Sequence, residues 1–191
     1  MPVTVSDIIS ITPPPFVVAK ATIASILKGG FIRDTFSRDR QVFEKIQRSV
    51  IGDMGKLSLK SWLSDNGFDV HDWDDIRRSW KSQRKEYDLQ VNNHNIEVRT
   101  SIAAEPQINY VLSHENIIHP CNVRVKEITV QVFFNSLSCT EAWLCGWARQ
   151  QDLENQSRIQ VRLVGRRLVD FYMIPFNDSD AEPLNSLLSF L

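Results

Sequence analysis

Two acidic residues and one arginine have the spacing of side chains that meet on a β-hairpin. Between Tyr87 and Ser101, polar and apolar residues alternate on both sides of an Asn-Asn-His-Asn turn, as is typical of two antiparallel strands. Asp88 belongs to the first strand and Glu97 to the second, so strand pairing could bring their carboxylates to one cation. Arg99 lies two residues beyond Glu97, on the same strand face, and could point its charge at a bound phosphate.

Paired carboxylates are typical ligands of a hard divalent cation. Mg²⁺ prefers oxygen ligands, keeps several water molecules and is often held by one or two carboxylates together with a substrate phosphate. The hairpin therefore predicts a Mg²⁺ site, which Mn²⁺ could also occupy, with Asp88 and Glu97 as its ligands. The alternative is that these two acids are exposed strand residues, or that they pair with basic residues nearby.

Basic residues crowd the segment immediately before the hairpin and form a candidate surface for DNA. They are Arg77, Arg78, Lys81, Arg84 and Lys85, with Trp80 among them. The net charge of the chain is -1, so any attraction for nucleic acid has to come from a local cluster such as this one. Each phosphate contact would add salt dependence to binding. The same run could instead be a solvated loop.

A second basic group lies in the C-terminal part of the chain, on an expected strand and its turn. Its members are Arg158, Arg162, Arg166 and Arg167. These arginines could contact DNA. A more ordinary explanation is surface solubility or pairing with Asp152, Glu154 and Asp170.

The residues before the hairpin predict a long helix that leads into a first strand. Ser37 can cap this helix, apolar residues from Val42 to Leu63 recur at helical spacing, and Asn66-Gly67 ends it. Gly52 and Gly55 inside the helix indicate either a break or a close approach of two backbones. From Phe68 onward the pattern changes to that of strands.

The residues after the hairpin predict more strands and a final helix. Strands are expected at 123–134, 141–147, 158–163 and 168–174, a helical turn at 148–153, and a helix at 184–191. The stretch from Glu105 to Pro120 is expected to be a functional loop or a short edge element. This order predicts an α/β or α+β domain with a central mixed sheet flanked by helices.

The first 36 residues are expected to form an N-terminal helical extension to a main domain at 37–191. The apolar run from Phe16 to Leu27 contains Lys20 and is shorter than the roughly 20 residues that span a bilayer, so no membrane segment is expected. It also lacks the features of a signal peptide. Its apolar side chains are expected to pack on the core or on a second copy in a homodimer.

An Asp on one strand followed, after a short turn, by Glu-x-Arg on the next resembles the PD-(D/E)XK nuclease superfamily, which has the restriction-endonuclease-like fold. In that family the Asp and Glu hold a divalent ion, and a Lys assists the attacking water or the scissile phosphate. The resemblance implies that Asp88 and Glu97 are metal ligands and catalytic residues, with Arg99 in the lysine position. The helix and turn from Gly52 to Val70 resemble the family's first core helix and its entry into the first strand, and the resemblance covers roughly residues 40–175.

Two residues depart from the family's pattern. Many members carry a Glu on the first helix, and the corresponding residue here is Lys56, whose positive charge could contact nucleic acid. Asp53 and Glu44 are the nearest acids that could replace that ligand. Arg99 can clamp a phosphate but cannot readily give or take a proton. Either change could preserve binding and slow the chemistry.

Composition and the absence of other motifs narrow the function classes. Hydrophobic content of 42% and charged content of 24% are ordinary for a globular protein. Three cysteines without CxxC spacing argue against a disulfide framework or a zinc ribbon and favour a reducing cytoplasm. The sequence contains neither a Gly-rich phosphate loop nor a nucleophile elbow.

These features predict a cytoplasmic, Mg²⁺-dependent DNA endonuclease, for which a homodimer would suit double-strand cleavage. The alternative is a nucleic-acid-binding or assembly protein that keeps the nuclease fold and has lost the chemistry, which Lys56 and Arg99 favour. A third possibility is an interaction module whose basic run binds an acidic protein.

Overall fold

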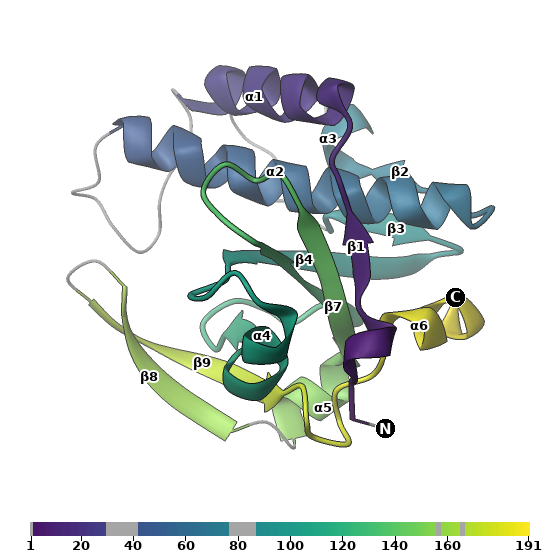
Figure 1. Cartoon of the computed structure of the whole chain (residues 1–191), viewed down its shortest axis with the longest axis vertical. Helices are drawn as coiled ribbons and strands as arrows, with labels where there is room; N and C mark the ends of the chain where they lie inside the picture. Colours follow the sequence, from purple (N-terminus) through teal and green to yellow (C-terminus); the bar gives the residue numbers. More distant parts are fainter. Residues whose placement is uncertain (1, 30–41, 77–86, 156–157, 165–166) are drawn as a thin grey trace.

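Two β-sheets form the centre of the chain, and helices lie on their outer sides (Figure 1). The computed structural model describes residues 2–29, 42–76, 87–155, 158–164 and 167–191. The strands of the larger sheet are β1 (Ile9–Ile11), β7 (Ala142–Arg149), β6 (Ile128–Phe134), β4 (His94–Ile102), β3 (Leu89–Val91) and β2 (His71–Asp72), in that spatial order. The smaller sheet has the order β5 (Asn116–Pro120), β9 (Arg167–Pro175) and β8 (Arg158–Val164).

The described helices surround these sheets. They are the short 3-10 helix η1 (Val5–Asp7), α1 (Pro15–Gly29), α2 (Val42–Asp65), α3 (Trp73–Ile76), α4 (Ile108–His114), α5 (Gln150–Asn155) and α6 (Leu184–Phe190). Within the larger sheet, β4 and β6 pair in parallel and the other neighbours pair antiparallel. The sequence-based prediction of a mixed α/β class with a central mixed sheet and flanking helices is therefore confirmed.

Helix α2 runs across one face of the larger sheet, with α1 as a further layer outside it (Figure 1). It is one uninterrupted helix from Val42 to Asp65, so its glycines do not break it. A Cβ atom added to Gly55 would lie 2.2 Å from Oγ1 of Thr100 on β4, whereas one added to Gly52 would meet nothing within 4 Å. The helix backbone therefore approaches β4 closely at Gly55.

Alternation along β4 and β6 divides the interior into two layers. Ile96 and Ile128 face α2 and belong to the first hydrophobic cluster, together with Leu57 of that helix. On the opposite face, Phe133 belongs to a second cluster that includes Ile117 of β5. Odd-numbered residues of β4 therefore face the layer between the two sheets.

The described part of the N-terminal segment joins the same core. Strand β1 pairs with β7, and the N–H of Val3 donates to the carbonyl of Phe176 at 2.8 Å. The predicted helix at 16–27 is confirmed as α1, whose Val17 and Ala21 are buried against α2. None of the helices described here is long and apolar enough to span a membrane.

The stretch from Glu105 to Pro120 is more ordered than the sequence indicates. It contains α4 and β5, and β5 is an edge strand of the smaller sheet. Buried Val111 and Ile117 attach these two elements to the second cluster. Its apolar residues are divided between these two short elements, so the local pattern is weak even though the tertiary contacts are specific.

Candidate hairpin site

Strands β3 and β4 form the hairpin that the sequence predicts. Leu89 pairs with Ile96 and Val91 pairs with His94, which leaves a two-residue turn. Both turn residues have positive φ, 46° at Asn92 and 70° at Asn93. This is the conformation of a type I′ turn, whose twist matches that of the flanking strands, and asparagine tolerates it better than most residues.

Asp88 lies beside Glu97. The N–H of Asp88 donates to the carbonyl of Ile96 at 3.0 Å, and Oδ2 of Asp88 accepts from the N–H of Val98 at 2.8 Å. These two contacts flank Glu97 along β4 and place Asp88, the residue before β3, next to it. Asp88 is buried, and the bond to Val98 fixes one oxygen of its carboxylate.

Glu97 and Arg99 form an ion pair on the face of β4 that looks toward the smaller sheet. Oε1 of Glu97 lies 3.2 Å from Nη2 of Arg99, and their side chains are 15% and 24% exposed. Burial lowers the pKa of the Arg99 guanidinium, and the charge of Glu97 opposes this shift. Nη2 approaches Glu97 outside hydrogen-bond geometry, and Nε of Arg99 is buried without an acceptor among the described residues. The guanidinium therefore retains donors that no described residue uses.

A polar strip on the adjacent strand β6 extends this site. Thr129 lies opposite Glu97 and Gln131 lies opposite Arg99 in the parallel ladder. Oε1 of Gln131 accepts from the N–H of Ile118 on β5 at 3.4 Å, which connects the two sheets. The buried Oγ1 of Thr129 has no hydrogen-bond partner among the described residues. The polar strip therefore has unused hydrogen-bonding capacity, as the guanidinium does.

His119 of β5 completes the polar layer and is fully buried. Its Nδ1 lies 3.0 Å from the carbonyl of Pro120, so that nitrogen carries the hydrogen and donates it. Burial and the positive charge of Arg99 lower the pKa of His119 to about 4, against the opposing charge of Glu97. The imidazole is therefore neutral at pH 7, and its buried Nε2 meets no partner among the described residues.

Sequence reasoning missed the polar strip and His119 as members of this site. The only local signal is that Thr129 and Gln131 are polar residues in an otherwise apolar strand. The sequence could not show that these residues lie near Arg99. The position of Thr129 and Gln131 depends on the register of β4 with β6. The position of His119 depends on where β5 packs.

Lys56 lies in a different and closed cluster. It is 3% exposed, and its Nζ lies 2.7 Å from Oδ1 of Asp72 and 2.6 Å from Oδ2 of Asp74. Burial alone would lower the pKa of Lys56, but the two carboxylates outweigh this effect, so its pKa is raised. The ammonium group is therefore used within the fold, at the end of β2.

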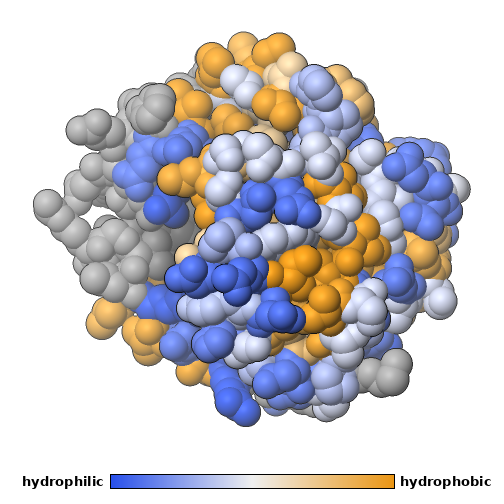
Figure 2. All heavy atoms as spheres, in the orientation of Figure 1, coloured by the Kyte–Doolittle hydropathy of each residue, from blue (hydrophilic) through white to orange (hydrophobic). Residues whose placement is uncertain are grey.

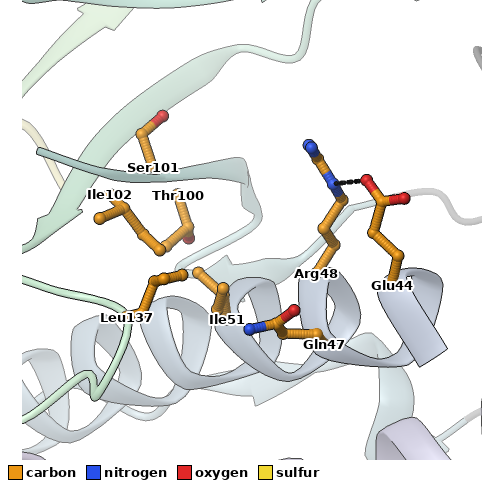
Figure 3. Close-up of a pocket in the computed structure, with 8 residues that line it drawn as sticks. All are labelled: Glu44, Gln47, Arg48, Ile51, Thr100, Ser101, Ile102 and Leu137. Carbon is orange, nitrogen blue, oxygen red and sulfur yellow. Dashed lines mark ion pairs between the residues drawn. The ribbon is translucent and has the colours of Figure 1, made fainter. Parts of the chain in front are cut away.

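The two acids named as substitutes for the helix ligand lie elsewhere on α2. Asp53 is buried and accepts a hydrogen bond from Ser25 of α1 at 3.0 Å. Glu44 lies 3.4 Å from Arg48 and lines a cavity of about 460 Å³ between the first turns of α2 and the end of β4 (Figure 3). In that view Ser101 points away from α2, whereas Thr100 points toward it.

The basic run from Arg77 to Lys85 lies outside the described residues, as does Arg166. Arg158 is exposed, and Nε of Arg162 donates to Oε1 of Gln160 at 3.0 Å. Within the described part of the chain, no ion pair joins either of these two arginines to an acid. The alternative that Arg158 or Arg162 pairs with Asp152, Glu154 or Asp170 is therefore not seen in these residues.

The donor chemistry of the hairpin fits a hard cation, because Asp88 before β3 and Glu97 on β4 supply carboxylate oxygens. Over residues 2–29, 42–76 and the other described ranges, no group of three or more His, Cys, Asp or Glu side chains is arranged to hold a metal. A cation held here would therefore need water or a phosphate for its remaining ligands.

Comparison with known proteins finds no matching family model, and neither a curated protein nor a solved structure is significantly similar to the chain. The function therefore has to be inferred from the hairpin residues and their neighbours.

Proposed function

We propose that this chain is a metal-dependent DNA endonuclease of the PD-(D/E)XK type, with a restriction-endonuclease-like fold. The observation that carries the proposal is the position of Asp88, the residue before β3, beside Glu97 of β4, with Arg99 on the same face of β4 as Glu97. The mixed sheet with α2 packed on one face is compatible with such a fold. Asp88 and Glu97 would hold Mg²⁺ or Mn²⁺.

Each residue of the hairpin would have a separate role in phosphodiester hydrolysis. When bound, the metal ion would polarise a phosphoryl oxygen and lower the pKa of an attacking water. Asp88 would be preoriented for this, because the N–H of Val98 fixes its carboxylate. Arg99 would donate its unused N–H groups to the phosphate and stabilise the charge that develops there. A guanidinium does not lose its proton readily, so Arg99 would not act as the general base.

A second candidate function is DNA binding without cleavage. The observation that favours it is the burial of Lys56 between Asp72 and Asp74. At the corresponding helix position, members of the family that the chain resembles often carry a carboxylate. An ammonium group there removes one potential metal ligand. Such a protein would keep the phosphate contacts of Arg99 and would be slow or inactive in hydrolysis.

Plasmid nicking separates the two candidates. Supercoiled plasmid is incubated with the protein and Mg²⁺ or Mn²⁺, beside Asp88→Asn and Glu97→Gln. Both substitutions keep the shape of the side chain and remove the charge, and the new amide oxygen at residue 88 can still accept from Val98. Asp69→Asn is the matched control, because the Asp69 side chain is 89% exposed.

The endonuclease proposal predicts metal-dependent nicking by the wild type and the Asp69 variant, and its loss in both hairpin variants. Retardation of DNA without nicking would favour the second candidate. A wild-type protein that neither nicks nor retards DNA would overturn both.

A further inference from the structure

Strand β8 has an open edge on the outside of the smaller sheet. The strand order β5-β9-β8 leaves β8 with only one neighbour among the described strands. Figure 1 shows the β8–β9 hairpin at the lower left, extending away from the larger sheet. An edge strand presents backbone N–H and C=O groups that a further strand can pair with.

The same hairpin exposes large apolar side chains on one face. Ile159 is 64% exposed and Val161 is 55% exposed, and alternation places both on one face of β8. Leu168 of β9, which is 74% exposed, pairs with Leu163 and so lies on that face as well. Figure 2 shows hydrophobic surface at the lower left, where this hairpin lies. Exposed apolar patches of this kind are typical of protein–protein interfaces.

We propose that a second copy of this chain covers the edge of β8, with the two β8 strands antiparallel about a two-fold axis at Val161. About this axis, Ile159 lies opposite Leu163 of the second copy, and Val161 lies opposite itself. On the other face, Gln160 lies opposite Arg162. Apolar residues therefore meet apolar residues on the first face, while on the second face Gln160 meets Arg162 and Arg158 meets Val164 at the end of the strand. The two small sheets would become one continuous sheet across the dimer.

Neighbouring registers are less favourable, which is why the sequence of β8 points to self-pairing about Val161. An axis at Gln160 would place Arg158 opposite Arg162. Like charges directly opposite each other on paired strands are destabilising. An axis at Arg162 would place the two copies of Arg162 opposite each other. The axis at Val161 avoids both conflicts.

Helix α1 is the rival surface for dimerisation. It exposes Phe16 and Ile23, which are 67% and 60% exposed. The backbone of α1 is already hydrogen-bonded within the helix, so a partner there would only bury apolar side chains. A partner strand on β8 would hydrogen-bond the unpaired backbone groups of that strand and also bury its apolar side chains.

Disulfide trapping tests the predicted axis. Directly opposed residues of antiparallel strands have Cα atoms about 4.5–5.5 Å apart, within the range of about 4.4–6.8 Å that a disulfide spans. Val161→Cys, made with Cys121→Ser to remove the most accessible native thiol, is expected to form a covalent dimer under mild oxidation. Ile159→Cys is the matched control, because the axis separates its two copies by four residues, or roughly 13 Å.

Light scattering then compares the two surfaces. The wild type is expected to have the mass of a dimer, and Val161→Lys, which places like charges on the axis, is expected to halve that mass. Ile23→Lys on α1 is expected to leave the mass unchanged. A monomeric wild type would overturn the proposal, as would equal trapping of both cysteine variants or dissociation by Ile23→Lys alone. A monomer whose DNA retardation is weakened by Val161→Lys would assign the hairpin to DNA and also overturn it.

Discussion

Two clusters of one basic and two acidic residues lie on this fold, and they differ in how completely their hydrogen bonds are satisfied. In the first, Lys56 lies 2.7 Å from Asp72 and 2.6 Å from Asp74, and all three side chains are at most 10% exposed. In the second, Arg99 lies 3.2 Å from Glu97, and these two side chains are 15–24% exposed.

The presence or absence of hydrogen-bond partners distinguishes a structural cluster from a candidate binding site. In the Lys56 cluster the ammonium group donates to both carboxylates, and these bonds link α2 to the end of β2. The Arg99 cluster leaves buried donors on Arg99 and a buried acceptor on His119 without partners among the described residues. Buried polar groups in folded proteins are nearly always hydrogen-bonded, so unused groups indicate water, an ion or a substrate as the missing partner. We therefore expect the first cluster to contribute stability and propose that the second binds a ligand.

The largest expected effect is the loss of Lys56. Lys56→Met would leave Asp72 and Asp74 buried without their cation, and breaking a buried ion pair in this way typically costs about 3–5 kcal/mol. Urea unfolding measures the loss. Lys60→Met is the control, because Lys60 pairs with Asp75 at 3.0 Å near the surface, where a pair contributes less than about 1 kcal/mol. Similar losses in both variants would contradict a closed, structural Lys56 cluster.

The same cluster predicts a dependence of stability on alkaline pH. The pKa of Lys56 is raised above the ordinary lysine value of 10.5, so its contribution is fully present below pH 10.5. That contribution is lost as the pH rises through the folded-state pKa. Unfolding free energies measured above pH 10 should therefore fall more steeply for the wild type than for Lys56→Met.

His119 predicts a dependence of stability on acidic pH in the open cluster. Its pKa is about 4 in the folded chain against 6.5 for an unperturbed histidine, so only the unfolded state takes up a proton between these values. The wild type should therefore lose up to about 3 kcal/mol of stability as the pH falls from 6.5 to 4. His119→Gln should lose less over that interval, as measured by urea unfolding in metal-free buffer. Parallel curves for the two proteins would contradict the low pKa.

Gly55 connects the two clusters, because it precedes Lys56 on α2 and contacts Thr100 next to Arg99. Gly55→Ala would place a Cβ atom 2.2 Å from Oγ1 of Thr100, and overpacking of this kind typically costs about 1–3 kcal/mol. Gly52→Ala meets nothing within 4 Å and should stabilise the helix by about 0.5–1 kcal/mol. Thermal unfolding compares the two variants. A neutral Gly55→Ala would show that α2 can move away from β4.

Asp88 has two roles in this account, because it supports the hairpin and is a proposed metal ligand. Asp88→Ala removes the acceptor of the Val98 N–H, and leaving such a buried group unsatisfied costs about 1–3 kcal/mol. Asp88→Asn should cost less, since its amide oxygen can accept the same bond. Urea unfolding of both variants separates the structural role from the charge. Equal losses would show that the carboxylate charge, and not the hydrogen bond, stabilises the hairpin.

Local patterns in the sequence were sufficient to predict several helices and strands of this fold. The alternation around Asn92-Asn93 predicted β3 and β4, and helical spacing predicted α1, α2 and α6. These elements could be predicted because their signals lie within a few turns or one hairpin. The expected strand at 123–134 was too long, since pairing with β4 begins only at Ile128.

Other features depend on contacts between distant parts of the chain. Strands β1 and β2 have three and two residues, too few to show a period, and both are defined by pairing with longer strands. The partners of Lys56 lie 16 and 18 residues away, across the end of the helix. His119 joins the site through the packing of β5 against β6. None of these relations leaves a local pattern in the sequence.

The central claim is that the hairpin cluster binds a divalent cation and the Lys56 cluster does not. Its most direct test is the binding of Mn²⁺, measured by the electron paramagnetic resonance signal of the free ion. Wild type and the exposed control Asp69→Asn should each bind a single Mn²⁺ per chain, and Glu97→Gln should weaken binding by at least about tenfold. Absence of Mn²⁺ binding by the wild type, or equal binding by Glu97→Gln, would contradict the claim.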